Sequence, residues 1–142
     1  MPTVILAEND LEQAQVYIKS LQTVGFNIIH VTNAEGIERT LTEQEVDIIV
    51  SDTNLDNSYG DEICSKLLQE GKLEKILIIG MSNALDYGDY WINVAHHFIH
   101  KKSLDKLYNL GQLVLQLYKT LKINPKTLRY KENPLIDRFT YS

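Results

Sequence analysis

The sequence contains a single cysteine, no long hydrophobic run and no basic N-terminal segment. Cys64 alone excludes an internal disulfide and is typical of a protein in a reducing compartment. The first residues, Met1 to Leu6, lack the basic region and the apolar core of a signal peptide. No segment approaches the ~18 consecutive apolar residues of a membrane helix. We therefore expect a soluble, cytoplasmic protein without membrane insertion.

Positive charge is also scarce over most of the chain. Residues 1–121 contain 17 Asp and Glu against 9 Lys and Arg, a net charge of -8, whereas residues 122–142 contain 5 Lys and Arg against 2 Asp and Glu, a net charge of +3. The main part would repel a phosphate backbone, so direct DNA binding is not expected. The length of 142 residues fits one domain.

Short apolar runs alternate with amphipathic segments along residues 1–121. Strands are predicted at residues 3–7, 26–31, 46–51, 76–81 and 97–99. Helices are predicted at residues 11–24, capped by Asp10; 33–41, capped by Thr32 or Asn33; 61–69; 86–94; and a last one to about 121, capped by Ser103. Strict alternation predicts a flavodoxin-like, doubly wound α/β fold with five helices around a parallel sheet of strand order 2-1-3-4-5.

The regular pattern ends at residue 122. Asn-Pro pairs at 124–125 and 133–134 would break a helix, yet the segment 122–142 has too many apolar residues for a pure linker. We expect one domain at 1–121 and a basic, proline-containing C-terminal tail at 122–142, which docks either on the domain or on a partner.

Polar side chains follow four of the predicted strands at the points where these strands end. They are Glu8, Asn9 and Asp10; Asp52 and Asn54; Ser82 and Asn83; and His100, Lys101 and Lys102. The carboxyl ends of parallel strands meet at one edge of a sheet, where such folds bind ligands. Clustered oxygen ligands suit Mg²⁺, and a nearby ammonium and hydroxyl would stabilise a transferring phosphoryl group. The chemistry fits an aspartyl phosphate.

From about residue 3 to 121 the chain resembles the receiver domain of two-component response regulators (the CheY-like family). Asp52 matches the family's phosphoacceptor, with Gly60 eight residues on, while Ser82 and Phe98 match its switch residues and Lys101 its lysine. The resemblance implies a stand-alone response regulator that is phosphorylated on Asp52 by a histidine kinase or phosphotransfer protein. It implies no enzyme acting on other substrates, only a part in its own phosphoryl transfer and dephosphorylation. Output would be through a downstream protein bound at residues 86–121, and a homodimer is left open.

The resemblance also implies a Mg²⁺ site, for which the candidate residues are Glu8, Asn9, Asp10, Asp52 and Asn54. Asn9 stands where the family has a second acid, so metal binding is expected to be weak. Because of this residue and two further departures, Asn83 and Lys102, the alternative is a degenerate receiver that acts as a phosphorylation-independent interaction module.

Two other readings of the sequence are less favoured. A flavodoxin-like enzyme or cofactor carrier is disfavoured because no glycine-rich phosphate loop follows the first strand. His96, His97 and His100 could suggest a metal cluster, but side-chain alternation along a strand separates them, so we expect surface histidines.

Overall fold

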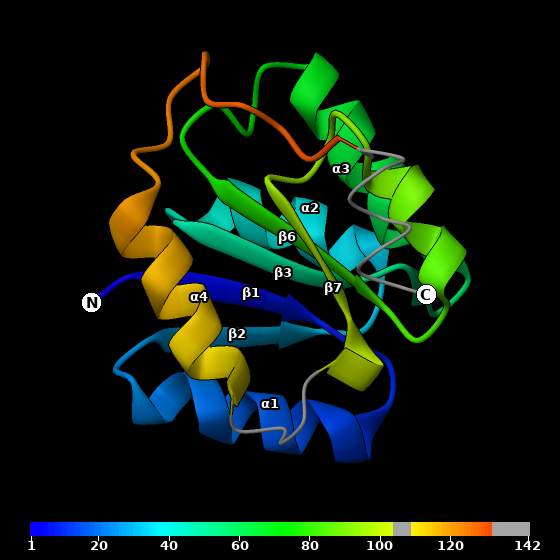
Figure 1. Cartoon of the computed structure of the whole chain (residues 1–142), viewed down its shortest axis with the longest axis vertical. Coiled ribbons are helices and arrows are strands. Elements are labelled where there is room, and N and C mark those ends of the chain that lie inside the picture. The colour runs from blue at the N-terminus through cyan, green and yellow to red at the C-terminus, as the bar shows by residue number, and fades with distance from the viewer. Residues whose placement is uncertain (104–108, 132–142) are drawn as a thin grey trace.

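The computed structural model describes residues 1–103 and 109–131 and contains a central parallel sheet (Figure 1). Its strands are β1 (Thr3–Ala7), β2 (Asn27–Val31), β3 (Ile48–Asp52), β6 (Leu77–Ser82) and β7 (His97–His100). They are ordered β2-β1-β3-β6-β7, and all neighbours are parallel. The five-stranded parallel α/β sheet is therefore as predicted. The predicted fourth and fifth strands carry the labels β6 and β7, because two short strands that were not predicted lie between β3 and β6 in the chain.

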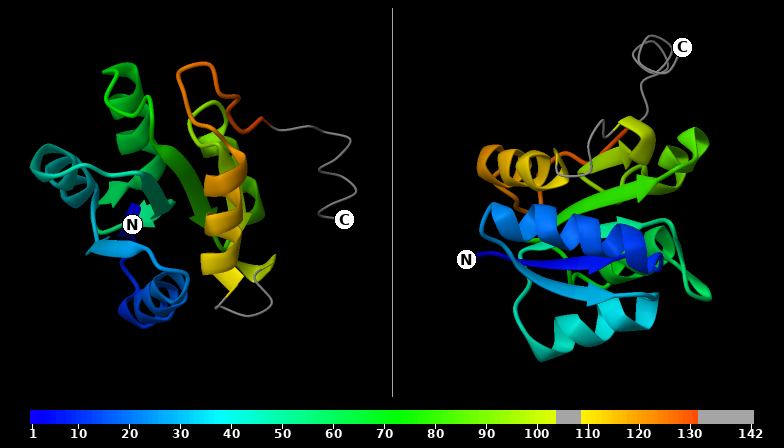
Figure 2. Two further views of the ribbon diagram at one scale, coloured as in Figure 1. Left: turned by 90° about the vertical axis from the view of Figure 1, so that its left-hand side faces the viewer. Right: turned by 90° about the horizontal axis from the view of Figure 1, so that it is seen from below.

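Helices cover both faces of the sheet, as the three views show (Figures 1 and 2). The helices are α1 (Leu11–Thr23), α2 (Ala34–Glu43), α3 (Gly60–Gln69) and α4 (Asn109–Thr120). Side chains alternate along each strand, so Val4 and Leu6 of β1 pack in the core under α1 and α4, whereas Ile5 and Ala7 pack under α2 and α3. The result is a doubly wound architecture whose strands all end at the same edge.

Side-chain caps fix where the first two helices begin. The Asp10 carboxylate accepts hydrogen bonds from the amides of Glu12 and Gln13, as expected for an N-cap. Asn33, rather than Thr32, caps α2 by accepting from the Gly36 amide at 2.8 Å. The cap at Asp10 commits that side chain to α1, which matters for the site described below.

The predicted helix at 86–94 is wrong: this segment forms a 3₁₀-helix, η1 (Leu85–Trp91). The described residues therefore contain four α-helices, not five. Gly88 and the aromatic residues around it have low helix propensity, and Trp91 is fully buried against β6. Its indole lies so close to Gly80 that a Cβ at this position would collide with the ring. Tertiary packing of the tryptophan thus outweighs the weak helical pattern.

The segment predicted as a loop after β3 contains a short antiparallel hairpin. Its strands are β4 (Asn54–Leu55) and β5 (Ser58–Tyr59), and Asn57 adopts a positive φ of 52° in the turn. Asparagine tolerates this left-handed conformation better than most residues. The hairpin places Tyr59 directly before α3, where it is half exposed.

The last helix packs against α1, and the segment after it packs beside the start of β7. The predicted start of this helix after Ser103 falls on residues 104–108, outside the described residues; Ser103 itself ends a short 3₁₀-helix, η2 (Lys101–Ser103). Gly111 lets α4 approach α1 closely, since its amide donates to the Ser20 hydroxyl at 2.9 Å.

Further on, Tyr130 donates a hydrogen bond from its amide to the Ala95 carbonyl at 2.7 Å, and its ring lies 6.0 Å from that of Phe98. Residues 122–131 therefore dock on the domain, in part. In the described ranges no helix is long and apolar enough to span a membrane.

Candidate functional site

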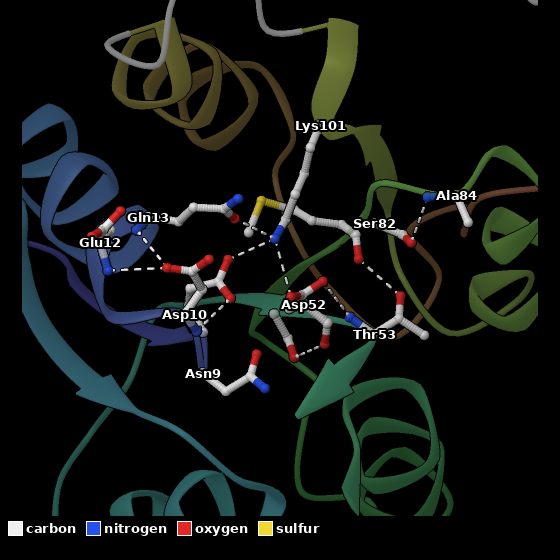
Figure 3. A network of polar contacts seen from close by, with 12 residues as sticks. Asn9, Asp10, Glu12, Gln13, Asp52, Thr53, Ser82, Ala84 and Lys101 are labelled. Carbon is white, nitrogen blue, oxygen red and sulfur yellow. Dashed lines mark hydrogen bonds and ion pairs between the residues drawn. The ribbon is translucent and has the colours of Figure 1, made fainter. Parts of the chain in front are cut away.

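Three charged side chains from three strand ends meet at the carboxyl edge of the sheet (Figure 3). Lys101, which follows β7, places its Nζ 2.6 Å from Glu8 Oε1, after β1, and 3.0 Å from Asp52 Oδ2, at the end of β3. Glu8 is fully buried and Lys101 is 7% exposed. The sequence prediction that Glu8, Asp52 and Lys101 converge therefore agrees with the geometry. We call these three residues the carboxylate–lysine triad.

Burial and mutual charge set the protonation of the triad. Burial raises the pKa of Glu8, and the charge of Asp52 raises it further, while the hydrogen bond from Lys101 acts in the opposite direction. For Lys101, burial by itself lowers the pKa, but the charges and hydrogen bonds of Asp52 and Glu8 outweigh burial, and the pKa is raised. Lys101 therefore stays protonated.

Two residues of α1 complete the surroundings of the ammonium, and sequence reasoning missed both. Lys101 Nζ also donates to Gln13 Oε1 at 2.9 Å, and it lies 5.9 Å from the centre of the buried Tyr17 ring. Helical periodicity puts Asp10, Gln13 and Tyr17 on the same face of α1. Because Asp10 was already assigned to the strand edge, this spacing could have indicated that Gln13 and Tyr17 also face the site.

The two proposed switch residues lie apart from the triad. Ser82, 4% exposed at the end of β6, accepts a hydrogen bond from the Ala84 amide at 3.0 Å. Phe98 is 6% exposed and packs against Tyr130. Neither side chain forms a hydrogen bond with Asp52, whose carboxylate bonds to the Thr53 amide and to Lys101.

The remaining residues predicted for a metal site are not brought together. The Asn9 side-chain amide donates to Asp56 at 3.4 Å, the Asp10 carboxylate caps α1, and Asn54 is exposed on β4. Within residues 1–103 and 109–131, no group of three or more His, Cys, Asp or Glu side chains is arranged to hold a metal ion. The carboxylates of Glu8 and Asp52 converge on the ammonium of Lys101, which lies between them.

A buried chain of hydrogen bonds, also missed from the sequence, connects Asp52 to η1. The Thr53 amide donates to Asp52 Oδ1 at 3.0 Å, and the Thr53 hydroxyl donates to the Met81 carbonyl at 2.8 Å. The same hydroxyl accepts from the Trp91 indole N–H at 2.8 Å. Gly60 closes the other side, because a Cβ there would collide with the Asp52 carbonyl. These contacts hold the backbone of Asp52 in place and explain the glycine eight residues after it.

The expectation of surface histidines is wrong for His96, which is 8% exposed. Its Nδ1 accepts a hydrogen bond from the Ile78 amide at 3.0 Å, near the start of β6 and away from the triad. Burial, together with the smaller effect of the Arg129 charge, lowers the pKa of His96 to about 4. The ring is therefore neutral at physiological pH and stabilises the beginning of the strand.

The fold and the site together define a flavodoxin-like α/β protein with an acid and lysine centre at the strand ends. The sequence profile of the response regulator receiver domain matches residues 4–110, and the chain belongs to this family. It is thus a receiver domain of the kind found in two-component response regulators, as the motif analysis indicated.

Solved structures show the same fold at low sequence identity. The phosphorylated cyanobacterial phytochrome response regulator RcpA matches with a TM-score of 0.75 and 17% identity, covering 88% of this chain and 99% of RcpA. The chemotaxis response regulator CheY4 of Vibrio cholerae gives 0.72 and 16%, covering 83% and 98% of the two chains. TrrA of Thermotoga maritima, solved with Mg²⁺ and BeF, gives 0.70 and 17%, covering 85% and 100%. The search of curated proteins gave no match.

Proposed function

We propose that this receiver domain accepts a phosphoryl group on Asp52 from a histidine kinase or a phosphotransfer protein and signals through contacts with a downstream protein. The pair of Asp52 and Lys101 carries the proposal. The Asp52 side chain is 14% exposed, and its Oδ2 lies 3.0 Å from the Lys101 ammonium. A carboxylate is a suitable nucleophile toward phosphorus, and a fixed cation beside it stabilises negative charge as this charge develops.

In the proposed transfer, an oxygen of Asp52 attacks the phosphorus of a phosphohistidine. The phosphorus–nitrogen bond breaks, and the released imidazole nitrogen takes up a proton. Lys101 would then lie beside the acyl phosphate, and the Ser82 hydroxyl would turn from the Ala84 amide toward a phosphoryl oxygen. Phe98 would follow that movement, so that the phosphorylated state binds the partner better than the unmodified state.

Glu8 and Asp52 offer carboxylate oxygens, the ligand type that a hard cation prefers, on either side of the Lys101 ammonium. We propose that Glu8 and Asp52 would hold Mg²⁺, with oxygens of Asn9, Asp10 and Asn54 as further candidates. The bound cation would offset the charge of the phosphoryl group. Affinity should be low, because Asn9 is neutral and the Asp10 carboxylate is engaged as a helix cap.

The test is to incubate the protein with Mg²⁺ and acetyl phosphate, or with a cognate phosphorylated kinase, and to measure the intact mass. We expect a mass increase of one phosphoryl group, lost in Asp52→Asn. The matched control is Asp89→Asn, the same change at an exposed aspartate. A mass increase that persists in Asp52→Asn, or none with a cognate kinase, would contradict the proposal.

A phosphorylation-independent interaction module is the second candidate. It is favoured by Asn9, which stands in place of a second acid and whose amide donates to Asp56. In either case we propose residues 1–121 as the receiver domain, residues 122–142 as a tail, and residues 86–121 as the surface for the downstream protein. The two functions differ in a simple way. A module would bind its partner equally well as wild type, as Asp52→Asn and after incubation with a phosphodonor.

A further inference from the structure

A small pocket beside the phosphoacceptor has an unusual combination of aromatic and acidic walls. It has a volume of about 200 Å³ and is lined by Tyr59, Asp61, Glu62, Tyr87 and Tyr90, with Thr53 and Asn54 at the hairpin start. We call it the tyrosine–acid pocket. Thr53 follows Asp52 directly, so the pocket adjoins the triad without sharing a charged residue with it.

The two walls of the pocket come from different parts of the fold. Tyr87 and Tyr90 belong to η1, where their rings meet edge to face with centroids 5.4 Å apart. Tyr59 ends the β4–β5 hairpin, and Asp61 and Glu62 lie in the first turn of α3. The replacement of a regular helix by η1 is therefore what presents two tyrosines to the acids of α3.

The acids have a structural role in α3 that does not account for the tyrosines. Carboxylates in a first helical turn interact favourably with the helix dipole. However, Tyr59 and Tyr90 are 51% and 57% exposed, and they are two of the large hydrophobic residues that the described surface leaves uncovered. Concave sites with exposed aromatic rings and a few polar groups are typical of ligand binding.

The chemistry of the walls specifies a cation. Among the described residues no Lys or Arg forms an ion pair with Asp61 or Glu62. Tyrosine ring faces attract cations, and the two carboxylates add negative charge. Burial raises the pKa of Asp61 and the charge of Glu62 raises it further, while hydrogen bonds from the amides of Asp61 and Glu62 act in the opposite direction.

The size and shape of the pocket restrict the kind of cation that it can bind. Its volume is below the ~300–1,000 Å³ of typical small-molecule sites and suits a single side chain. A guanidinium group can stack on a tyrosine ring and bond to carboxylates through its planar edge at the same time, which an ammonium cannot do. The net charge of -8 over residues 1–121 favours a basic partner segment.

We propose that the tyrosine–acid pocket binds an arginine side chain of a protein partner. Tyr59, Tyr87 and Tyr90 would surround the guanidinium, and Asp61 and Glu62 would balance its charge. This proposal goes beyond phosphorylation and holds whether or not Asp52 accepts a phosphoryl group.

The test is a titration of the isotope-labelled full chain with the peptide acetyl-Gly-Arg-Gly-amide, followed by amide chemical shifts. We expect saturable shifts at residues 53–62 and 87–90. Affinity should fall at least ~5-fold in Tyr90→Ala and in Glu62→Gln, from the loss of a cation–π contact or of one charge. The matched control is Glu35→Gln, the same change at an exposed acid in the first turn of α2, which should alter affinity less than ~2-fold.

Two further peptides decide the chemistry. The citrulline peptide, which keeps the shape but not the charge, should show no saturable binding, and the lysine peptide should bind more weakly than the arginine peptide. Equal binding of the citrulline or lysine peptide would overturn the assignment of a guanidinium. An equal effect of Glu35→Gln and Glu62→Gln would overturn the assignment of this pocket.

Discussion

Replacing Lys101 by methionine should destabilise the domain in a pH-dependent way. The change keeps most of the side-chain volume but removes the ammonium that lies 2.6 Å from Glu8 and 3.0 Å from Asp52. Two acids would then face each other, one fully buried and the other mostly buried. Removing one partner of a buried ion pair typically costs about 3–5 kcal/mol, and we expect a loss of that size at pH 8.

The loss should decrease as the pH falls. In the variant, Glu8 loses the hydrogen bond that lowers its pKa but keeps the burial and the Asp52 charge that raise it. A folded-state pKa above the unfolded value means that the folded chain binds the proton more tightly, so stability falls as the pH rises between the two values. Because the pKa of Glu8 is already raised in the wild type, the loss relative to wild type should change by about 1.4 kcal/mol per pH unit between the wild-type folded-state pKa of Glu8 and its higher value in the variant.

Urea unfolding followed by circular dichroism at pH 5 and pH 8 measures the effect. Lys119→Met, the same change at an exposed lysine of α4, should alter stability by less than ~0.5 kcal/mol at both pH values. The double variant Lys101→Met with Glu8→Gln should recover part of the loss at pH 8, since one buried charge is removed. An equal loss at both pH values, or a loss no larger than that of Lys119→Met, would refute the electrostatic account of the triad.

Two further predictions concern the packing around the site. The pKa of His96, about 4 in the folded chain against an ordinary 6.5, means that the unfolded chain takes up the proton first. Stability should therefore drop by about 3 kcal/mol as the pH falls from 6.5 to 4, and His96→Asn, which can still accept from the Ile78 amide, should remove this slope in unfolding titrations. Gly80→Ala should cost about 1–3 kcal/mol because its methyl group meets the Trp91 ring. The cost should shrink in a Trp91→Leu background, and additive losses in that double-mutant cycle would contradict the proposed contact.

The strands and the meeting of Glu8, Asp52 and Lys101 could be predicted from the sequence because both depend on simple periodicities. Apolar runs indicate buried parallel strands, and parallel strands end at one edge. The η1 segment could not be predicted this way. Its conformation depends on Trp91 packing against Gly80, a contact between residues distant in sequence that no local propensity encodes. The burial of His96 was missed for the same reason, since its hydrogen bond to the Ile78 amide arises only when β6 and the segment before β7 lie side by side.

The contacts of Thr53 give one physical reason why the backbone at Asp52 and η1 depend on each other. Its amide donates to the Asp52 carboxylate, and its hydroxyl both donates to the Met81 carbonyl and accepts from the Trp91 indole. The buried Thr53 hydroxyl makes one bond as donor and one as acceptor. If Trp91 moved away, both this hydroxyl and the indole N–H would lose a hydrogen bond, which is costly for buried groups. The position of Trp91 in turn fixes the segment that carries Tyr87 and Tyr90. The hydrogen bonds of Thr53 therefore hold both the backbone at Asp52 and the η1 wall of the neighbouring pocket. Neither η1 nor β3 could make these bonds alone.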